Sequence, residues 1–335
     1  MNALIYGAGS LGIVLGAYLA KAGAEVTLCN RNPGQVEALN TQGAKVIGTV
    51  EMTVPVKAIL PDQVEGPYDV VFLMTKQLDN ETSCRFLKDK LSPKGVIVTL
   101  QNGLPEMGIA QIVGPERTLG CAVAWGATLE GNGVSRLTSD PDHLTMSLGP
   151  TDGVPSHTLA AVKALLEKMC PVEVEENFMG ARMSKLLINA AFSGMSAVTG
   201  RTFGEAAARK DSRRVVQGLI KECLEVSKAA NIPLAKVQGK DIGKLLDYNG
   251  PVKKALSFLI IPIAIKKHAA LKASMLQDIE KGKPTEVDAI NGAVSQLGRQ
   301  HGIPTPLNDT VVRLIHEMEK GRRTPGWENI AEFEV

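Results

Sequence analysis

A glycine-rich loop near the N-terminal end of the sequence constrains the fold more than any other feature. The apolar run 3–6 precedes it, and an Ala- and Leu-rich stretch with helical periodicity follows it. The loop consists of Gly7, Ala8, Gly9, Ser10, Leu11 and Gly12 and fits the pattern G-x-G-x-x-G. In this context Gly7 permits a tight turn, Gly9 lets a pyrophosphate approach the backbone, and Gly12 lets the helix pack on its strand. The sequence therefore predicts a strand–loop–helix unit that binds a dinucleotide on the amides of the helix N-terminus.

The first half of the chain alternates short apolar runs with helical patterns. Strands are expected at 3–6, 25–29, 69–74 and 95–100, and helices at 10–22, 35–39 and 80–91. The nearly continuous apolar run at 69–74 is typical of a strand buried on both faces of a parallel sheet. Runs at 118–129, 133–138 and 143–148 predict an antiparallel extension, which a helix at 156–169 and a strand at 171–174 close. This alternation predicts the α/β class, with an N-terminal Rossmann-type doubly wound sheet.

No strand pattern is found from residue 178 onward. Helical segments there are interrupted at Gly200, Pro233, Gly250, Gly282 and Gly302. We therefore expect two domains: 1–177, which binds the dinucleotide, and 178–335, which is all-helical and serves substrate binding and dimerisation. The apolar stretch 256–265 is, at about ten residues, too short to span a bilayer. It suits a buried helix end or a helical contact between two subunits of a homodimer.

Composition excludes several kinds of partner. Lys and Arg number 37 against 35 Asp and Glu, a formal charge of +2, and aromatic residues make up 4%. A near-neutral chain lacks the charge that recruits DNA, and few aromatics argue against stacking on single-stranded nucleic acid. Neither a targeting signal nor a membrane span is recognised. The five cysteines are scattered without metal-ligand spacing, so we expect no metal site and reduced thiols in a cytoplasmic protein.

The end of the second expected strand selects between the two nicotinamide cofactors. NAD-binding domains usually carry a carboxylate there to hold the ribose hydroxyls. This chain has the sequence CNRN at 29–32, in which Arg31 is the charged residue. A guanidinium holds a 2′-phosphate with two hydrogen bonds, whereas a carboxylate repels it. Arg31 therefore predicts NADP(H), the alternative being a solvated surface arginine.

Polar residues follow two further expected strands of the parallel sheet. Lys76 comes after the run 70–75, and Asn102 after the run 95–100. Because ligands bind at the carboxyl ends of parallel strands, both residues are expected near the nicotinamide end of the cofactor. The alternatives are a surface charge at a helix start for Lys76 and a simple turn at Asn102.

Three residues of the helical half share one predicted helix face. Lys185, Asn189 and Ser193 are spaced i, i+4, i+8 among apolar neighbours. Enclosure lowers the pKa of a lysine and makes it a proton donor near neutrality. The alternative is a lysine that extends to solvent.

A third group of polar residues lies at 274–288. Ser274 belongs to a helical pattern, and Thr285 with Asp288 has the spacing of a capping box, which would put Glu286 in the first turn of a helix. From this position alone, Glu286 would complement the helix dipole.

Taken together, these residues resemble the ketopantoate reductase (2-dehydropantoate 2-reductase) family over nearly the whole chain. The most specific part of the resemblance is the stretch 274–292, followed by the HGIPTP sequence at 301–306. The resemblance implies that Lys185 and Glu286 are catalytic, and that NADPH reduces ketopantoate to pantoate in pantothenate biosynthesis. It also implies cofactor contacts from the loop 7–12, Arg31, Lys76 and Asn102. Substrate contacts are implied for Asn102, Asn189, Ser193 and Ser274.

The sequence departs from the family pattern at two positions. The family commonly has asparagines where this chain has Ser193 and Leu271. Because a hydrogen-bonding site discriminates by what it leaves unpaired, a more apolar 2-oxo acid or another ketone is an alternative substrate. A second alternative is a non-catalytic NADPH-binding regulatory protein, which would have lost the polar residues of the helical half.

Overall fold

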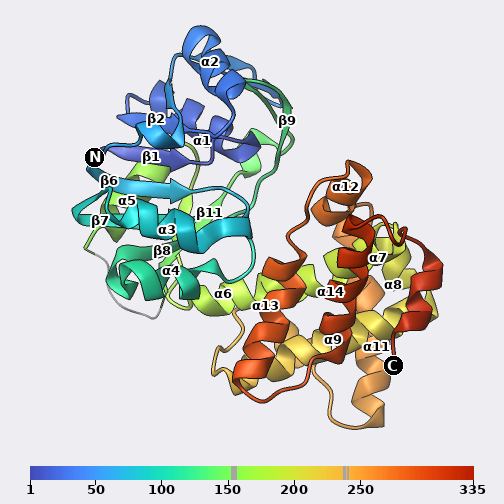
Figure 1. The fold of residues 1–335 in the computed structure, drawn as a ribbon. Coiled ribbons are helices and arrows are strands. Elements are labelled where there is room, and N and C mark those ends of the chain that lie inside the picture. The colour runs from blue at the N-terminus through green and yellow to red at the C-terminus, as the bar shows by residue number, and fades with distance from the viewer. Residues whose placement is uncertain (152–156, 237–238, 240) are drawn as a thin grey trace. The chain divides into compact units, whose positions relative to one another are not determined.

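The computed structural model describes residues 1–151, 157–236, 239 and 241–335 (Figure 1). The chain divides into two compact units, each with its own core. The first unit comprises Met1–Gln101 and Pro105–Phe178, and the second comprises Asn102–Leu104 and Met179–Val335. The roles of the two parts in cofactor and substrate binding stay predictions.

The first unit is built on an eight-stranded sheet of order β12-β11-β8-β7-β6-β1-β2-β5. Its strands are β1 (Ala3–Tyr6), β2 (Val26–Cys29), β5 (Lys57–Ile59), β6 (Tyr68–Leu73), β7 (Leu91–Thr99), β8 (Thr118–Val123), β11 (Met146–Pro150) and β12 (Val172–Val174). All pairs from β5 to β8 are parallel, β11 is antiparallel to β8, and β12 is parallel to β11. The chain proceeds from β1 toward β5 on one side and from β6 toward β8 on the other. The predicted doubly wound sheet is confirmed, with its switch point between β1 and β6.

The helices of this unit connect the strands. They are α1 (Ser10–Lys21), α2 (Pro33–Gln42), α3 (Asn80–Lys88), α4 (Pro105–Val113) and α5 (Leu159–Leu166). Residue 156, where the sequence places the start of the last helix, lies outside the described residues. None of the helices in the described part of the chain combines the length and the apolarity needed to cross a bilayer.

The expected antiparallel extension at 118–148 is wrong as a single element. Its strands divide between two sheets: β8 and β11 extend the main sheet, whereas β9 (Ala127–Gly131) and β10 (Val134–Leu137) join β3 (Ala44–Gly48) and β4 (Met52–Val54) in a second, four-stranded sheet. The cause is the composition of α1, whose residues from Gly12 to Ala17 are all buried. A helix that is apolar on all sides needs cover on both sides. The second sheet supplies that cover, because β3, β4, β9 and β10 all pack against α1.

The second unit is helical throughout its described residues, as predicted. Its helices are α6 (Phe178–Ile188), α7 (Gly194–Thr199), α8 (Phe203–Ala208), α9 (Lys210–Ala229), α10 (Ile242–Leu246), α11 (Pro251–Ala264), α12 (Ser274–Glu280), α13 (Val287–Gln300) and α14 (Pro306–Glu319). A π-helical turn, η5 (Asn189–Ser193), joins α6 to α7. The 20-residue helix α9 packs against α8, α10, α11, α13, α14 and η5, so it forms the centre of this unit.

Candidate active site

The three glycines of the loop after β1 are glycine for different physical reasons. Gly7 has φ +114, and a Cβ there would come within 2.6 Å of the Thr75 amide nitrogen. A Cβ on Gly12 would approach the Gly7 carbonyl oxygen to 2.4 Å. Gly9 is different, because its φ of −86 suits any residue and a Cβ would meet no atom within 4 Å. Gly7 and Gly12 are therefore required by the protein's own packing, whereas Gly9 keeps open space beside the backbone.

This open space lies at the N-terminus of α1, with Gly9 as the N-cap residue. No side chain caps the helix, and its first turn has no acidic residue. The first amides of a helix have no partner within the helix and carry partial positive charge. The neighbouring Ala8 carbonyl accepts hydrogen bonds from the side chains of Asn30 (2.8 Å) and Gln35 (2.9 Å), which fix the loop. The loop residues therefore fit a pyrophosphate group.

Arg31 follows β2 and is exposed. Within the described residues, no carboxylate forms an ion pair with it. Its neighbour Asn32 caps α2 by accepting a hydrogen bond from the Gly34 amide at 3.0 Å. The guanidinium is thus available to an anionic ligand, and the segment 29–32 at the end of β2 contains no acidic residue.

The loop after β6 approaches the glycine loop, as expected at a switch point. The distance of 2.6 Å from a Cβ on Gly7 to the Thr75 nitrogen shows how closely the two loops pass. The buried Gln101 side chain donates to the Thr75 carbonyl oxygen at 2.9 Å and to Asn80 Oδ1 at 2.7 Å. Gln101 therefore fixes the loop that carries the exposed residue Lys76. The sequence did not indicate this role of Gln101.

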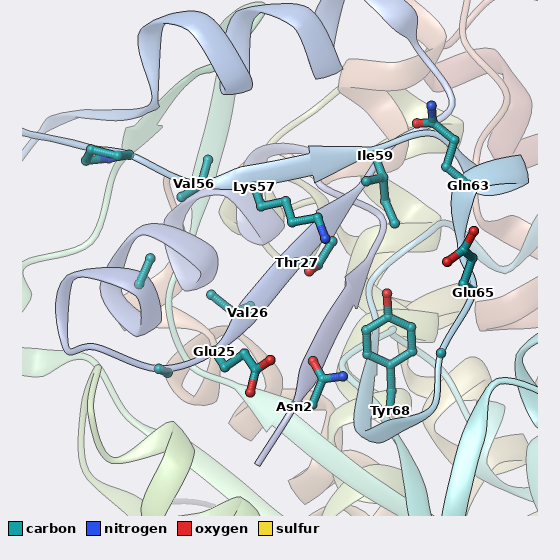
Figure 2. A pocket seen from close by; sticks show the side chains of 14 residues that line it. Asn2, Glu25, Val26, Thr27, Val56, Lys57, Ile59, Gln63, Glu65 and Tyr68 are labelled. Atoms are coloured by element: carbon teal, nitrogen blue, oxygen red, sulfur yellow. The ribbon is translucent and has the colours of Figure 1, made fainter.

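A hollow of about 600 Å³ in the first unit lies at the other edge of the sheet. Figure 2 shows Lys57 extending between Thr27 and Tyr68, with Glu25 and Glu65 nearby. These side chains lie at the amino ends of strands, away from the glycine loop, and carboxylates outnumber the lysine. The hollow therefore does not suit a phosphate-bearing cofactor.

In the second unit, the predicted Lys185, Asn189 and Ser193 lie on successive turns of α6 and η5. Lys185 and Asn189 are half-buried, and Ser193 is buried with 8% exposure. The expected regular spacing is interrupted, because a π turn closes i→i+5 hydrogen bonds and holds an additional residue. Lys185 and Asn189 therefore bracket the entry to the π turn, and Ser193 faces inward at its end.

A buried polar chain supports this π turn from the neighbouring helices. Asn291 of α13 donates to the Ala190 carbonyl oxygen at 3.0 Å and to Asn308 Oδ1 at 2.9 Å. The Glu222 carboxylate accepts hydrogen bonds from the amides of Leu307 and Asn308, at the start of α14. Burial raises the pKa of Glu222, and these hydrogen bonds counteract the increase. Local sequence patterns do not indicate this network, since its members are far apart along the chain.

Glu286 is the N-cap residue of α13, with Asn102 as its neighbour. The Asn102 Nδ2 atom lies 3.5 Å from Glu286 Oε2, and both residues are half-buried. Asn102 belongs to the second unit although it follows a strand of the first. The structure thus brings together two predicted site residues that are 184 positions apart.

The predicted capping box at Thr285 and Asp288 is wrong. Helix α13 begins at Val287, so Glu286 precedes its first turn, and the Glu286 side chain makes no capping hydrogen bond. Thr285 is buried and its amide donates to Glu319 Oε1 at 2.7 Å, while its hydroxyl accepts from the Val287 amide. A carboxylate from α14 therefore fixes this backbone, where a local cap was expected.

Near the start of α13, His316 of α14 lies between the carboxylates of Asp288 and Glu319. His316 Nδ1 is 2.8 Å from Glu319 Oε2, and Nε2 is 3.0 Å from Asp288 Oδ1. Partial burial acts to lower the pKa of His316, but the two carboxylates outweigh burial and raise it. We call the set Asp288, His316 and Glu319 the carboxylate–histidine clamp. Through it α14 contacts the chain on both sides of Glu286: Glu319 accepts a hydrogen bond from the Thr285 amide, and His316 contacts Asp288.

Ser274 is the first residue of α12 and is exposed. Helices α12 and α13 both pack against η5, so the elements that carry Ser274 and Glu286 converge on the π turn. Leu271, which stands where the resemblance expects an asparagine, is 50% exposed.

Comparisons with known proteins agree with this arrangement over both units. A family model described as "Ketopantoate reductase PanE/ApbA" matches residues 3–152, and one described as "Ketopantoate reductase PanE/ApbA C terminal" matches residues 177–319. The chain is 25% identical over 324 residues to the 2-dehydropantoate 2-reductase of Aquifex aeolicus, covering 95% of this chain and 97% of that protein. Identity to the enzyme of the same name from Streptococcus pyogenes is 25% over 321 residues, covering 95% and 98%.

Solved structures give the same result. A PanE/ApbA family ketopantoate reductase from Ralstonia eutropha superposes with a TM-score of 0.81 at 25% identity, covering 96% of this chain and 99% of that chain. D-mandelate dehydrogenase with NADH and anilino(oxo)acetate gives a TM-score of 0.80 at 22% identity, covering 96% and 99%, a likeness that concerns the fold alone.

Proposed function

The chain belongs to the ketopantoate reductase family, and from this premise we propose that it reduces a 2-oxo acid to a 2-hydroxy acid with NADPH, with ketopantoate as the first candidate substrate. It is an oxidoreductase of the 2-dehydropantoate 2-reductase type. The observation that carries the proposal is the pairing of Glu286 with Asn102 at 3.5 Å, because both residues are implied in catalysis or substrate contact by the family pattern.

The choice of NADPH over NADH depends on residues of the first unit. The open space at Gly9 and the uncapped helix N-terminus fit the pyrophosphate that both cofactors share. Arg31 supports the 2′-phosphate that only NADPH carries, because a guanidinium can bind it with two hydrogen bonds.

The mechanism follows from charge development on the substrate. The reduced nicotinamide supplies the hydride for the ketone carbon when the cofactor is bound. Negative charge then grows on the ketone oxygen, where the Lys185 ammonium stabilises it and donates a proton. Glu286 accepts a hydrogen bond from a substrate hydroxyl, and Asn102 orients the Glu286 carboxylate. Asn189, one turn after Lys185, positions the carbonyl group, and Ser274 binds the carboxylate.

A second candidate is the same reaction on a more apolar 2-oxo acid or another ketone. It is favoured by Ser193, which is buried and short, and by the exposed apolar side chain of Leu271, both at positions of expected asparagines. Sites that lack such donors discriminate weakly against apolar substituents. A non-catalytic NADPH-binding role is less well supported, because Lys185, Asn189, Ser274 and Glu286 are all present.

The proposal is tested with a panel of 2-oxo acids of graded polarity, incubated with the protein and NADPH or NADH. We expect oxidation of NADPH with at least one member, and a higher kcat/KM with NADPH than with NADH. The best substrate separates the two candidates: ketopantoate supports the first, and a branched or aromatic 2-oxo acid the second. Failure to turn over any member would overturn both. All five cysteines are buried free thiols, which supports the proposal of a cytoplasmic enzyme.

A further inference from the structure

The carboxylate–histidine clamp holds the chain immediately before and after Glu286. Before it, the buried residue Thr285 donates its amide hydrogen bond to Glu319 Oε1 at 2.7 Å. After it, Asp288 in the first turn of α13 lies 3.0 Å from His316 Nε2. Both contacts come from one helix, α14, which packs against α13 (Figure 1). The backbone position of Glu286 is therefore set from a neighbouring helix.

Local contacts hold this backbone only in part. The Glu286 side chain makes no capping hydrogen bond, and the Val287 amide donates to the Thr285 hydroxyl at 3.2 Å, the long end of the usual range. Helix ends fray because their first amides have no partner within the helix. Glu319 and His316 thus add the contacts that a side-chain cap supplies in other helices.

The arrangement of the clamp requires a protonated histidine. Nδ1 of His316 is 2.8 Å from Glu319 Oε2 and Nε2 is 3.0 Å from Asp288 Oδ1, so both ring nitrogens face carboxylates. An ionised carboxylate only accepts hydrogen bonds, and a neutral imidazole has one N–H to donate, whereas the imidazolium has two. Loss of the proton would leave one carboxylate facing the lone pair of a ring nitrogen, so one of the two contacts would break.

The charged groups that face His316 come from the two helices of the clamp. Asp288 and Glu319 raise its pKa against the effect of partial burial. Helix α7 also packs on α14 and contains no titratable residue, and the α9 carboxylate that contacts α14, Glu222, binds the amides at the opposite end of that helix. The other charged groups nearby are Glu286 beside Asn102, Glu317 paired with Arg313 and Arg323, and the exposed Lys283 and Lys320. Carboxylates stay ionised near neutral pH, so His316 is the member of the clamp whose charge changes there.

From this geometry we propose that His316 and Glu319 are positioning residues for the reduction: the protonated clamp fixes the backbone of Glu286, and deprotonation of His316 weakens substrate binding. This role rests on the proposed function, which makes Glu286 a substrate contact. His316 and Glu319 act through the backbone and touch neither substrate nor cofactor. A displaced Glu286 carboxylate loses part of its hydrogen bond to the substrate hydroxyl. The effect therefore falls on KM, whereas Lys185, as the proton donor, acts on kcat.

The first test follows the KM for the best 2-oxo acid of the panel from about pH 6 to about pH 9, the range in which a histidine with a raised pKa loses its proton. The clamp is charged at the acidic end and loses its charge as pH rises through the folded pKa. The wild-type KM should rise by roughly two- to tenfold, the effect of losing one hydrogen bond. His316→Gln should have the high KM at every pH. His143→Gln, at an exposed histidine of the first unit, is the matched control and should follow the wild type.

His316→Lys separates the charge from the imidazole ring. A lysine stays charged over this range and has three N–H donors, enough for both carboxylates. Its KM should therefore stay low where the wild-type KM rises, and a rise equal to that of the wild type would overturn the role of the charge. Glu319→Gln should raise KM throughout, with Glu317→Gln on the same helix as its control. Partial unfolding of a variant would lower the apparent kcat and leave KM unchanged, because KM does not depend on the concentration of active protein.

Failure of this role is distinguishable from failure of the proposed function. If the wild type reduces 2-oxo acids and the KM of His316→Gln follows the same pH profile, the positioning role is overturned and the proposed function stands. If no 2-oxo acid is turned over, the proposed function fails and the positioning of Glu286 fails with it. An NMR titration of the His316 Cε1 proton checks the clamp without turnover: the wild-type pKa should lie above about 6.5 and fall in Glu319→Gln. A wild-type pKa at or below that value would overturn the protonated clamp.

Discussion

Lys185 combines the two properties that a proton donor to a growing oxyanion needs. It carries a transferable proton, and it is half-buried between the buried residues Ser184 and Leu186. We expect Lys185→Ala to lower kcat by roughly 10²–10⁴-fold, the range found for a positioned general acid. The measurement is steady-state NADPH oxidation with the best substrate of the panel.

Lys185→Arg separates charge from proton transfer. A guanidinium keeps the positive charge but does not release its proton at accessible pH. Arginine should therefore restore substrate affinity without restoring kcat. A loss below about threefold in the alanine variant would remove Lys185 from the role of general acid.

Arg31 is the residue on which cofactor choice depends. Arg31→Ala should raise the KM for NADPH by roughly 10–100-fold, the effect of losing hydrogen bonds between charged groups, and leave the KM for NADH nearly unchanged. Arg85→Ala is the control, since Arg85 is exposed on α3 in an ion pair with Glu81. Equal effects of Arg31→Ala on both cofactors would show that Arg31 does not bind the 2′-phosphate.

At the scale of elements, the π turn depends on α13. Asn291 is fully buried and donates to the Ala190 carbonyl oxygen inside that turn. Asn291→Ala leaves this oxygen without its buried partner, so we expect a loss of about 1–3 kcal/mol in the free energy of unfolding. We also expect a lower kcat, because Asn189 and Lys185 lie at the entry to the turn. Denaturant unfolding and turnover are measured together, with the exposed Asn249→Ala as control.

Two outcomes would contradict this view of the π turn. If Asn291→Ala leaves the free energy of unfolding unchanged, the Ala190 carbonyl oxygen has found another hydrogen-bond donor. A loss of stability with an unchanged kcat would mean that the turn does not position the catalytic lysine.

The elements differ in how far sequence predicts them. The glycine loop and the parallel strands β1, β2, β6 and β7 carry strong local patterns, and the structure confirms them. Strands β3, β4 and β5 were missed because exposed polar residues interrupt their apolar patterns. Strand β3 pairs with β10, about ninety positions away along the chain, and within the described residues β4 pairs only with β3. Such pairing is not visible in a local window.

The site shows the same limit. Helical spacing predicted that Lys185 and Asn189 share one helix face, and the structure places Lys185 on α6 and Asn189 at the start of η5. The π turn itself is supported by a distant partner, Asn291, which a local sequence pattern does not contain. Likewise, Thr285 and Asp288 have the spacing of a capping box. In the structure, however, the Thr285 amide donates its hydrogen bond to the side chain of Glu319 on α14. Residues that act through long-range hydrogen bonds are therefore the ones that sequence patterns miss.

The carboxylate–histidine clamp makes the start of α13 sensitive to pH. The pKa of His316 is raised and the pKa of Glu319 is lowered in the folded protein. Stabilisation from a raised His316 pKa is complete below the unfolded value of about 6.5 and is lost as pH rises through the folded value. Stabilisation from Glu319 is present above its unfolded value and is lost as pH falls through the folded one. The clamp is therefore strongest in mildly acidic solution.

We expect His316→Gln to reduce stability more at about pH 5.5 than at about pH 8.5. The measurement is the midpoint of denaturant unfolding for both proteins at each pH. His143→Gln is the control, because His143 lies in the first unit and is largely exposed. A difference between wild type and His316→Gln that stays constant with pH would show that the charge of His316 does not stabilise the clamp.

At the scale of the whole molecule, each unit has its own apolar core, and the predicted cofactor residues of the glycine loop belong to the first. A ligand that binds only the folded state stabilises it by about 2.7 kcal/mol at a concentration of 100 Kd. NADPH should therefore raise the unfolding midpoint of the protein, and NADH at the same concentration should raise it less. Differential scanning fluorimetry without substrate measures this binding independently of turnover.

Two glycine variants show whether this stabilisation arises at the loop after β1. Gly9→Ala places a methyl group in the open space and contacts no protein atom within 4 Å, so the protein without ligand should unfold as the wild type does. Its gain from NADPH should be reduced, because the methyl group occupies the path of the pyrophosphate. Gly12→Ala should do the opposite: its Cβ would lie 2.4 Å from the Gly7 carbonyl oxygen, which destabilises the protein before any ligand is added. An unchanged NADPH response in Gly9→Ala would place the cofactor elsewhere, since among the residues that the structure describes no atom lies within 4 Å of a Cβ at that position.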